Sequence, residues 1–261
     1  MRELLELAKK AAVSAGAEIL KHYNKFEVYK KMDSSPLTTA DLAANEKIFE
    51  ILSVSGIEIC SEERILGDEL RLKSDRFWLV DPLDGTKEFI KQNGEFCVCI
   101  ALIERAKPVL GVIFIPTTNE LFYTNGNECF KEICTQPNQI INLSKVTKNS
   151  KIAYTSTIKS KNLPHTLLIQ SGFDVVRIGS AIKFCRLCES GGVYIRLSPS
   201  SLWDIAAGEA IVRSCGGFMF DIKTKDEINY NTKSLKSPYF IALSKDMIEL
   251  KDEILQAIGS I

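Results

Sequence analysis

The first part of the chain carries apolar residues at helical spacing. Leucine, alanine and isoleucine recur every three or four positions, which predicts an amphipathic helix near residues 2 to 22. A second helix is predicted to begin at Thr38 or Thr39, because either hydroxyl can cap its first turn, and to run to about Leu52.

Short apolar runs then alternate with polar turns, as strands do. Ile57 to Cys60 and Phe77 to Val80 are each followed closely by carboxylates. Phe77 to Val80 is continuously apolar, which predicts a strand buried on both faces, and Pro82 is predicted to stop its pairing. Three further runs predict an antiparallel meander: 96–103, 109–115 and 120–123.

Residues 142–150 are polar and contain lysines, so we place a boundary there, between halves 1–145 and 146–261. The second half interleaves strand and helix patterns. Strands are expected at 151–156, 175–178 and 193–197, and helices near 161–171, after Gly179-Ser180, and from Trp203 to Gly216-Gly217. This mixture predicts an α/β (α+β) fold.

Charge and composition narrow the function. The 261 residues carry 33 Lys plus Arg and 33 Asp plus Glu, so no overall basic field attracts nucleic acid or an anionic membrane. The charged first ten residues differ from a signal peptide, and no stretch approaches the roughly 20 apolar residues of a spanning helix. We expect a cytoplasmic protein with no integral membrane segment, with peripheral attachment to the inner membrane as the alternative.

Eight cysteines in a chain of this length, without a secretory signal, predict buried thiols rather than disulfides. Cys97 and Cys99 alternate on one face of a strand, as core residues do. Cys185 and Cys188 have zinc-like spacing. No second cysteine pair or histidine follows at finger spacing, which favours two buried thiols on a helix.

The stretch from Asp81 to Thr86, Asp-Pro-Leu-Asp-Gly-Thr, is the most informative one. It places two carboxylates at the end of a buried strand, where α/β proteins bind ligands, and Gly85 permits a tight backbone. Asp81 and Asp84 offer hard oxygen ligands suited to a magnesium-type cation. Glu62 can join them if the two acid-bearing strands are neighbours.

The remaining candidates also have ordinary local explanations. Asp41 and Asp204 lie near helix N-termini, where a carboxylate is stabilised by capping and by the helix dipole. Gly179, Ser180 and Lys183 form either a common helix cap or a grip for a phosphate, through backbone amides and the ammonium group.

Taken together, these segments resemble the inositol monophosphatase superfamily, in its usual chain order. The matching elements are Ser-Pro-x-Thr-x-Ala-Asp at 35–41, Glu-Glu at 62–63, Asp-Pro-Leu-Asp-Gly-Thr at 81–86 and Trp-Asp-x-Ala-Ala-Gly at 203–208. The resemblance extends from the first helix to about Asp221. Three features are similar to the branch of 3′(2′),5′-bisphosphate nucleotidases: Asp-Gly-Thr-Lys-Glu-Phe at 84–89, Gly-Ser-x-x-Lys-Phe-Cys at 179–185, and Arg196 with Pro199 ahead of Trp203.

The resemblance implies a layered αβαβα sandwich, of the inositol monophosphatase and sugar phosphatase type, with a metal pocket between the two halves. It implies two or three Mg²⁺ ions, bound by Glu62, Asp81, the Leu83 carbonyl, Asp84 and Asp204. Asp41 would serve a further ion through water. The resemblance also implies a role in sulfate assimilation and inhibition by lithium.

Transfer of a phosphoryl group to water requires charge neutralisation, a positioned nucleophile and a stabilised leaving group, which two or three magnesium ions supply. Thr86 can hydrogen-bond the attacking water and pass its proton to Glu62 or Asp41, and both acceptors remain open. We expect the substrate to contact Glu62, Leu83, Asp84, Gly85, Thr86, Asp204, and, through a second phosphate, Gly179, Ser180 and Lys183. Tyr194 or Arg196 is a candidate neighbour of the base or sugar.

The predicted function is a Mg²⁺-dependent phosphatase that converts adenosine 3′(2′),5′-bisphosphate to AMP and phosphate. Its partner would be this small phosphorylated molecule, not nucleic acid, and the protein would be a monomer or homodimer. One alternative is an inositol monophosphatase or sugar-bisphosphate phosphatase with the same metals. Another is a non-catalytic regulator that binds metal or nucleotide. Lys87-Glu88 and the 179–183 segment favour the nucleotidase, and the intact acids and Thr86 favour an enzyme.

Overall fold

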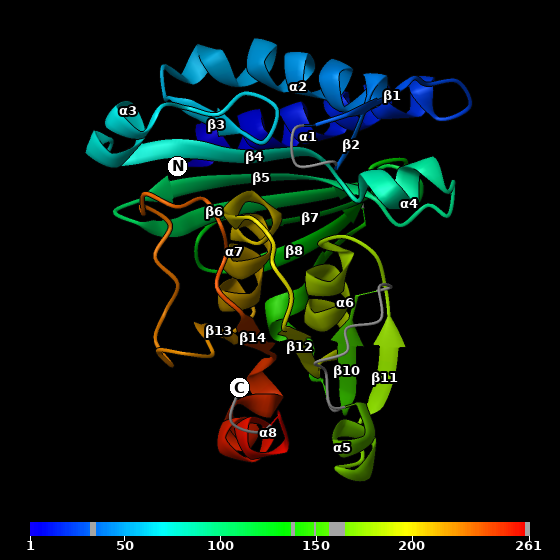
Figure 1. The fold of residues 1–261 in the computed structure, drawn as a ribbon, viewed down its shortest axis with the longest axis vertical. Helices are drawn as coiled ribbons and strands as arrows, with labels where there is room; N and C mark the ends of the chain where they lie inside the picture. Colours follow the sequence, from blue (N-terminus) through cyan, green and yellow to red (C-terminus); the bar gives the residue numbers. More distant parts are fainter. Residues whose placement is uncertain (32–34, 137–138, 149, 157–164, 259–261) are drawn as a thin grey trace.

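The computed structural model describes residues 1–31, 35–136, 139–148, 150–156 and 165–258 (Figure 1). The helices are α1 (Arg2–His22), α2 (Thr39–Leu52), α3 (Asp68–Lys73), α4 (Thr86–Ile90), α5 (His165–Gln170), α6 (Ile182–Ser190), α7 (Ala206–Ser214) and α8 (Lys251–Ile258). The short 3₁₀ helices are η1 (Ser53–Ser55), η2 (Leu143–Lys145), η3 (Leu202–Asp204) and η4 (Lys245–Leu250).

Two sheets and one hairpin contain the strands. The hairpin pairs β1 (Val28–Lys30) with β2 (Pro36–Thr38). The seven-stranded sheet runs in chain order through β3 (Ile59–Ser61), β4 (Arg76–Asp84), β5 (Cys97–Glu104), β6 (Lys107–Ile115), β7 (Glu120–Thr124), β8 (Cys129–Ile133) and β9 (Ile140–Asn142). The five-stranded sheet has the order β11 (Asp174–Arg177), β10 (Ile152–Thr155), β12 (Val193–Arg196), β14 (Phe240–Leu243) and β13 (Phe218–Asp221).

The sheets and helices stack in five layers (Figure 1). Helices α1 and α2 cover one face of the seven-stranded sheet, and α6 and α7 lie between the two sheets. Side chains of α5 and α8 form a separate apolar cluster with the outer face of the five-stranded sheet. This arrangement confirms the predicted αβαβα sandwich, because each helix layer buries one apolar sheet face.

Strand β5 shows why the large sheet lies inside the molecule. Cys97 and Cys99 point into the layer shared with α6 and α7, whereas Val98 and Ile100 pack toward α1 and α2. Because successive side chains alternate between faces, an entirely apolar strand needs cover on both sides. The two cysteines are buried, as predicted from their spacing.

The predicted end of the central strand is wrong. Strand β4 does not stop at Pro82 but continues to Asp84, pairing Asp81 with Cys99 and Asp84 with Cys97. The register shifts between these two pairs. An irregularity of this kind tolerates a proline, which has no N–H to donate, so the strand resumes after it.

The helix predicted to open at Trp203 is also different in detail. Trp203 and Asp204 lie in η3, and α7 begins only at Ala206, because Ile205 leaves helical geometry with φ −122°. The helix predicted near 161–171 corresponds to α5, and its first positions, 161–164, lie outside the described residues. Strands β1, β2, β8, β9, β13 and β14 and helices α3, α4 and α8 were not predicted.

The chain passes from one sheet to the other after β9 and enters the second at β10. Within the described part of the chain, none of the helices combines the length and apolar character needed to cross a membrane.

Candidate active site

Two of the acidic residues come from the irregular end of β4. Asp81 is 2% exposed, and its Oδ1 accepts a hydrogen bond from the backbone N–H of Leu83 at 3.0 Å. This bond tightens the backbone, so that Asp84 follows three residues later at the same edge of the sheet. The register shift therefore presents two carboxylates from one strand.

Glu62 follows the neighbouring strand. Strands β3 and β4 are parallel, with Ser61 paired to Val80, and the Glu62 amide donates to the Val80 carbonyl at 3.0 Å. The two acid-bearing strands are therefore neighbours, which is the condition under which Glu62 can join Asp81 and Asp84. The Ser61 hydroxyl donates to Asn45 on α2 at 2.7 Å and anchors the strand end.

Asp204 reaches the same place from the second half of the chain. In η3 its Oδ2 accepts from the Ser201 amide at 3.0 Å, as part of a capping box. Asp204 therefore stabilises the start of η3 through its capping bond and also belongs to the cluster of acids. One oxygen each from Glu62, Asp81 and Asp204 lies within 4.8 Å of the others.

Burial governs the electrostatics of this acidic cluster. It raises the pKa of Asp81 well above its usual value, and the charges of Glu62, Asp84 and Asp204 raise it further. Burial, then repulsion from Asp84, raises the pKa of Asp204 to about 7. Burial likewise raises the pKa of Asp84 to about 6, although the nearby Lys183 charge opposes it. Close, buried carboxylates repel one another unless a cation joins them.

The donor set fits a hard divalent cation. It consists of carboxylate oxygens, the ligands that magnesium-type ions prefer. A second group of possible ligands, Asp84 with Cys97 and Cys99, fits less well. The Cys97 hydrogen bond, together with burial, raises the pKa of Cys99 well above its usual value, and a protonated thiol does not bind magnesium.

Asp84 also connects the two halves of the chain. Its Oδ2 accepts a hydrogen bond from the Ala181 amide, just ahead of α6. A side chain on Gly85 would meet the Glu95 carbonyl at 2.9 Å and the Ser180 Cβ at 3.2 Å. Gly85 has φ +98° as well, so both the backbone geometry and the contact require glycine.

Thr86 and Asp41 form a pair beside the acidic cluster. The Thr86 hydroxyl lies 3.1 Å from Asp41 Oδ1 and 3.3 Å from the Leu83 carbonyl. The other Asp41 oxygen accepts from the amide and hydroxyl of Thr38, at 2.8 and 2.5 Å. Burial raises the pKa of Asp41, while the Thr38 and Thr86 bonds lower it. Thr38 is thus the N-cap of α2, one of the two predicted candidates.

The predicted phosphate grip has an unexpected geometry. Lys183 is 1% exposed, and its Nζ donates to the carbonyls of Ile178 and Ser180 at 3.0 and 2.5 Å. The Gly179 amide donates to Glu95 at 2.8 Å. Lys183 therefore stabilises the loop from within, and contributes its charge to Asp84 through space.

Arg196 lies close enough to affect the acidic cluster. Burial alone would lower its pKa, but Tyr194 and the charges of Asp204 and Asp84 raise it. Its guanidinium donates to the Pro199 carbonyl at 3.2 Å, and its buried Nε has no hydrogen-bond partner among the described residues.

Sequence reasoning did not identify Lys31. Its Nζ lies 2.6 Å from both Glu62 Oε1 and Glu63 Oε1, so it neutralises part of the acidic charge. Burial raises the pKa of Glu63 to about 7 even with this partner. No local sequence pattern predicts this contact, because Lys31 and Glu62 are 31 positions apart and only the fold brings them together.

An acidic cluster that could hold a metal ion, with an adjacent Thr–Asp pair, set between two sheets of an αβαβα sandwich, is the arrangement of a class of metal-dependent phosphatases. The model of the inositol monophosphatase family matches residues 1–258 of the chain. The chain therefore belongs to this family, which confirms the resemblance drawn from its motifs.

Relatives within the family are similar over most of their length. The 3′(2′),5′-bisphosphate nucleotidase CysQ of Salmonella typhimurium is 38% identical over 228 residues, covering 85% of this chain and 92% of the relative. CysQ of Buchnera aphidicola is 36% identical over 239 residues, covering 89% of each. The crystal structure of CysQ from Bacteroides thetaiotaomicron superposes with a TM-score of 0.78 at 34% identity, covering 92% of this chain and 97% of that one.

Proposed function

We propose that this protein is a Mg²⁺-dependent phosphatase that removes the 3′(2′)-phosphate from adenosine 3′(2′),5′-bisphosphate, leaving AMP. The acidic cluster carries this proposal, since Glu62, Asp81 and Asp204 bring oxygens within 4.8 Å of one another. Similarity to CysQ nucleotidases over most of the chain supports the choice of substrate. The family relationship would place the reaction in sulfate assimilation.

Glu62, Asp81, Asp84, Asp204 and the Leu83 carbonyl would hold two or three Mg²⁺ ions. The ions would neutralise phosphate charge, lower the pKa of a bound water and stabilise the departing ribose oxygen. The protein's own task is to keep these carboxylates together without the flexibility of exposed side chains. For Asp81, Asp84 and Asp204, hydrogen bonds donated by the amides of Leu83, Ala181 and Ser201 do this.

Thr86 would hold the attacking water and pass its proton on. Its hydroxyl contacts Asp41, which favours Asp41 over Glu62 as the acceptor. Glu62 is engaged by Lys31, a second reason to prefer Asp41. Positioned proton transfer of this kind contributes roughly 10²- to 10⁴-fold to a rate.

The second phosphate would lie by the loop that precedes α6. Lys183 keeps this loop in place, Ser180 lies against Gly85, and Arg196 adds a cation close to Asp84 and Asp204. We propose that the halves 1–145 and 146–261 meet here, since they contribute Glu62, Asp81 and Asp84, and Asp204 and Lys183 respectively.

A phosphate-release panel tests the substrate. With Mg²⁺ present, adenosine 3′,5′-bisphosphate should give a higher kcat/KM than inositol monophosphate or fructose bisphosphate. If another substrate is best, the nucleotidase assignment fails while a metal-dependent phosphatase stands. If none is hydrolysed but Mg²⁺ still raises the Tm, the chain is instead a metal-binding regulator. Lithium should inhibit the reaction.

We further propose a cytoplasmic location, a small phosphorylated molecule rather than nucleic acid as the partner, and a monomeric or homodimeric state. Sedimentation of the purified protein distinguishes the last two.

A further inference from the structure

Arg71 is a fully buried arginine in α3, the short helix that follows Glu62 in the chain. Its Nη1 donates to the Thr232 carbonyl at 2.6 Å, and its Nη2 donates to the Lys233 carbonyl at 3.1 Å. Nη2 also donates to Asp68 Oδ1 at 2.9 Å, although the Asp68 side chain is 49% exposed. The guanidinium therefore joins the first half of the chain to two successive carbonyls that lie 161 and 162 positions further on.

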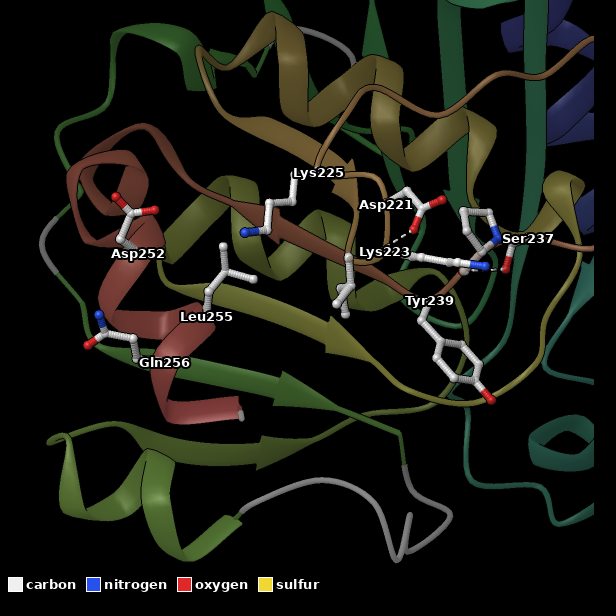
Figure 2. Close-up of a pocket in the computed structure, with 10 residues that line it drawn as sticks. Asp221, Lys223, Lys225, Ser237, Tyr239, Asp252, Leu255 and Gln256 are labelled. Carbon is white, nitrogen blue, oxygen red and sulfur yellow. Dashed lines mark hydrogen bonds between the residues drawn. The ribbon is translucent and has the colours of Figure 1, made fainter. Parts of the chain in front are cut away.

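These two carbonyls belong to residues 230–237, which we call the strap. The strap runs between β13 and β14, and it is irregular apart from a single bridge between Ser201 and Lys236. Ser237, at its end, borders a cavity of about 1100 Å³ at the edge of the five-stranded sheet (Figure 2). Backbone groups outside a ladder need other partners, and the cavity leaves this end of the strap unpacked on one side. Hydrogen bonds to neighbouring segments therefore fix the position of the strap.

The strap pairs with the segment that leads into η3. The Leu202 amide donates to the Leu235 carbonyl at 2.8 Å, and the Ser237 amide donates to the Ser200 carbonyl at 2.9 Å. The hydroxyls of Ser200 and Ser237 are 2.6 Å apart. These contacts fix the paired segment to the strap.

The paired segment in turn holds Asp204. The Ser201 amide, which lies between the two backbone pairs, donates to Asp204 Oδ2 at 3.0 Å. Asp204 is the acid that the second half adds to Glu62 and Asp81, and their oxygens lie within 4.8 Å of one another. A shift of the strap therefore changes the distance between Asp204 and the acids of the first half. Arg71 opposes this shift, because its helix belongs to the first half.

We propose that Arg71 is a positioning residue for the metal site: it ties the strap to α3 and so holds Asp204 within reach of the ion that Glu62 and Asp81 bind. The guanidinium suits this task, because its donors form a rigid planar fork that bonds two carbonyls and a carboxylate at once. A lysine, with one ammonium group on a flexible stem, can make only part of these bonds. The inference rests on the Mg²⁺ site of the proposed function and concerns Mg²⁺ affinity, not the identity of the substrate.

Calorimetric titration of the full chain with Mg²⁺ tests this role, because it requires no turnover. We expect Arg71→Met, which keeps an apolar side chain but removes the donors, to bind Mg²⁺ about tenfold more weakly than wild type, the usual scale for a residue that orients a metal ligand. Arg71→Lys should recover part of the loss. The matched control Asp68→Asn removes the ion pair but not the bonds from Arg71 to the strap, and it should bind Mg²⁺ as wild type does.

Thermal unfolding separates positioning from a general loss of stability. A purely structural role of Arg71 would lower the Tm of the metal-free and the Mg²⁺-containing protein equally, and the rise in Tm that Mg²⁺ gives would stay the same. Positioning requires that this rise becomes smaller in Arg71→Met. If Arg71→Met does not fold, Arg71→Lys and Ser237→Ala carry the test, because Ser237→Ala removes a contact between the strap and Ser200. Both should bind Mg²⁺ more weakly than wild type.

Wild-type Mg²⁺ affinity in Arg71→Met, or in both Arg71→Lys and Ser237→Ala, would overturn the inference and leave the metal site of the proposed function intact. Absence of Mg²⁺ binding to wild type would overturn that metal site and the inference together.

Discussion

Among the described residues, the acidic cluster and a second cluster, the ion pairs around the buried Glu120, differ in their counter-charges. In the acidic cluster, Asp81, Asp84 and Asp204 have raised pKa values because of burial and mutual repulsion. In the second cluster, Glu120 on β7 contacts Arg186 at 2.6 Å and also contacts Lys131. Burial alone would raise the pKa of Glu120, but Arg186, Lys131 and Thr118 together lower it to about 2.

The difference separates a binding site from a structural contact. Glu120 is paired within the chain, whereas the acidic cluster concentrates negative charge that its own cations only partly offset. A buried charge without a partner destabilises the fold, so the acidic cluster is stable only to the extent that a ligand completes it. Substitutions in the two clusters should therefore have opposite effects on the metal-free protein.

The largest expected effect is that of Asp84→Asn on catalysis. Removing this carboxylate should lower kcat/KM on the order of 10³-fold, since several kcal/mol of charge stabilisation depend on the bound ions. It should also abolish the rise in Tm that Mg²⁺ gives wild type. Without metal, the variant should melt at the wild-type temperature or higher, because a source of repulsion is gone. A Tm gain in Mg²⁺ equal to that of wild type would exclude Asp84 as a ligand.

Thr86→Ala should reduce kcat about 10²-fold and change KM little, because it removes the hydroxyl that contacts Asp41 but no carboxylate. Steady-state kinetics with saturating Mg²⁺ measures both values. Thr86→Ser, which keeps the hydroxyl, is the matched control and should retain most of the activity. Wild-type turnover by the alanine variant would remove Thr86 from the mechanism.

Glu120→Gln should lower the free energy of unfolding by about 1–3 kcal/mol at pH 7, a range that allows for partial solvent screening. The folded pKa, about 2, is below the usual 4.5, so this stabilisation is complete above pH 4.5. It is lost as the pH falls from 4.5 toward 2. Urea unfolding should show a smaller difference in the free energy of unfolding between wild type and Glu120→Gln at pH 3 than at pH 7. A difference independent of pH would indicate lost packing instead.

Glu209 is an intermediate case and should give the smallest effect. Burial raises its pKa to about 7, although Tyr230 and Arg213 donate hydrogen bonds to it. Because the folded pKa is raised, its protonated form stabilises the fold at low pH. That contribution decreases as the pH rises from 4.5 to 7. Relative to wild type, Glu209→Gln should gain about 1–2 kcal/mol in unfolding free energy between pH 5 and pH 8. An equal pH dependence of the unfolding free energy in wild type and Glu209→Gln would contradict a raised pKa of Glu209 in the folded protein.

Much of the fold could be predicted because it follows from local sequence patterns. The spacing of apolar residues identified α1, and the Thr38 cap located the start of α2. The meander from β5 to β7 followed from runs separated by proline-containing turns. Strands β1, β2, β8, β9, β13 and β14 were missed because their short sequences become strands only when they pair with a neighbour.

The continuation of β4 past Pro82 was predicted wrongly for a related reason. Proline opposes regular pairing, and sequence alone does not show that the partner strand accommodates a register shift there. The same irregularity brings Asp81 and Asp84 to one edge of the sheet. The local rule therefore failed at the place where the candidate site is built.

The sequence by itself determined the family, the layered fold and the identity of the candidate ligands, because these depend on residue types in a fixed chain order. Only the tertiary structure decided which charges meet. It brought Glu62 and Asp204 to Asp81, linked Thr86 to Asp41, and placed Lys31 against Glu62. It also turned Lys183 inward to the carbonyls of its own loop. Electrostatic energy depends on separation in space and on burial, and neither can be obtained from positions along a chain.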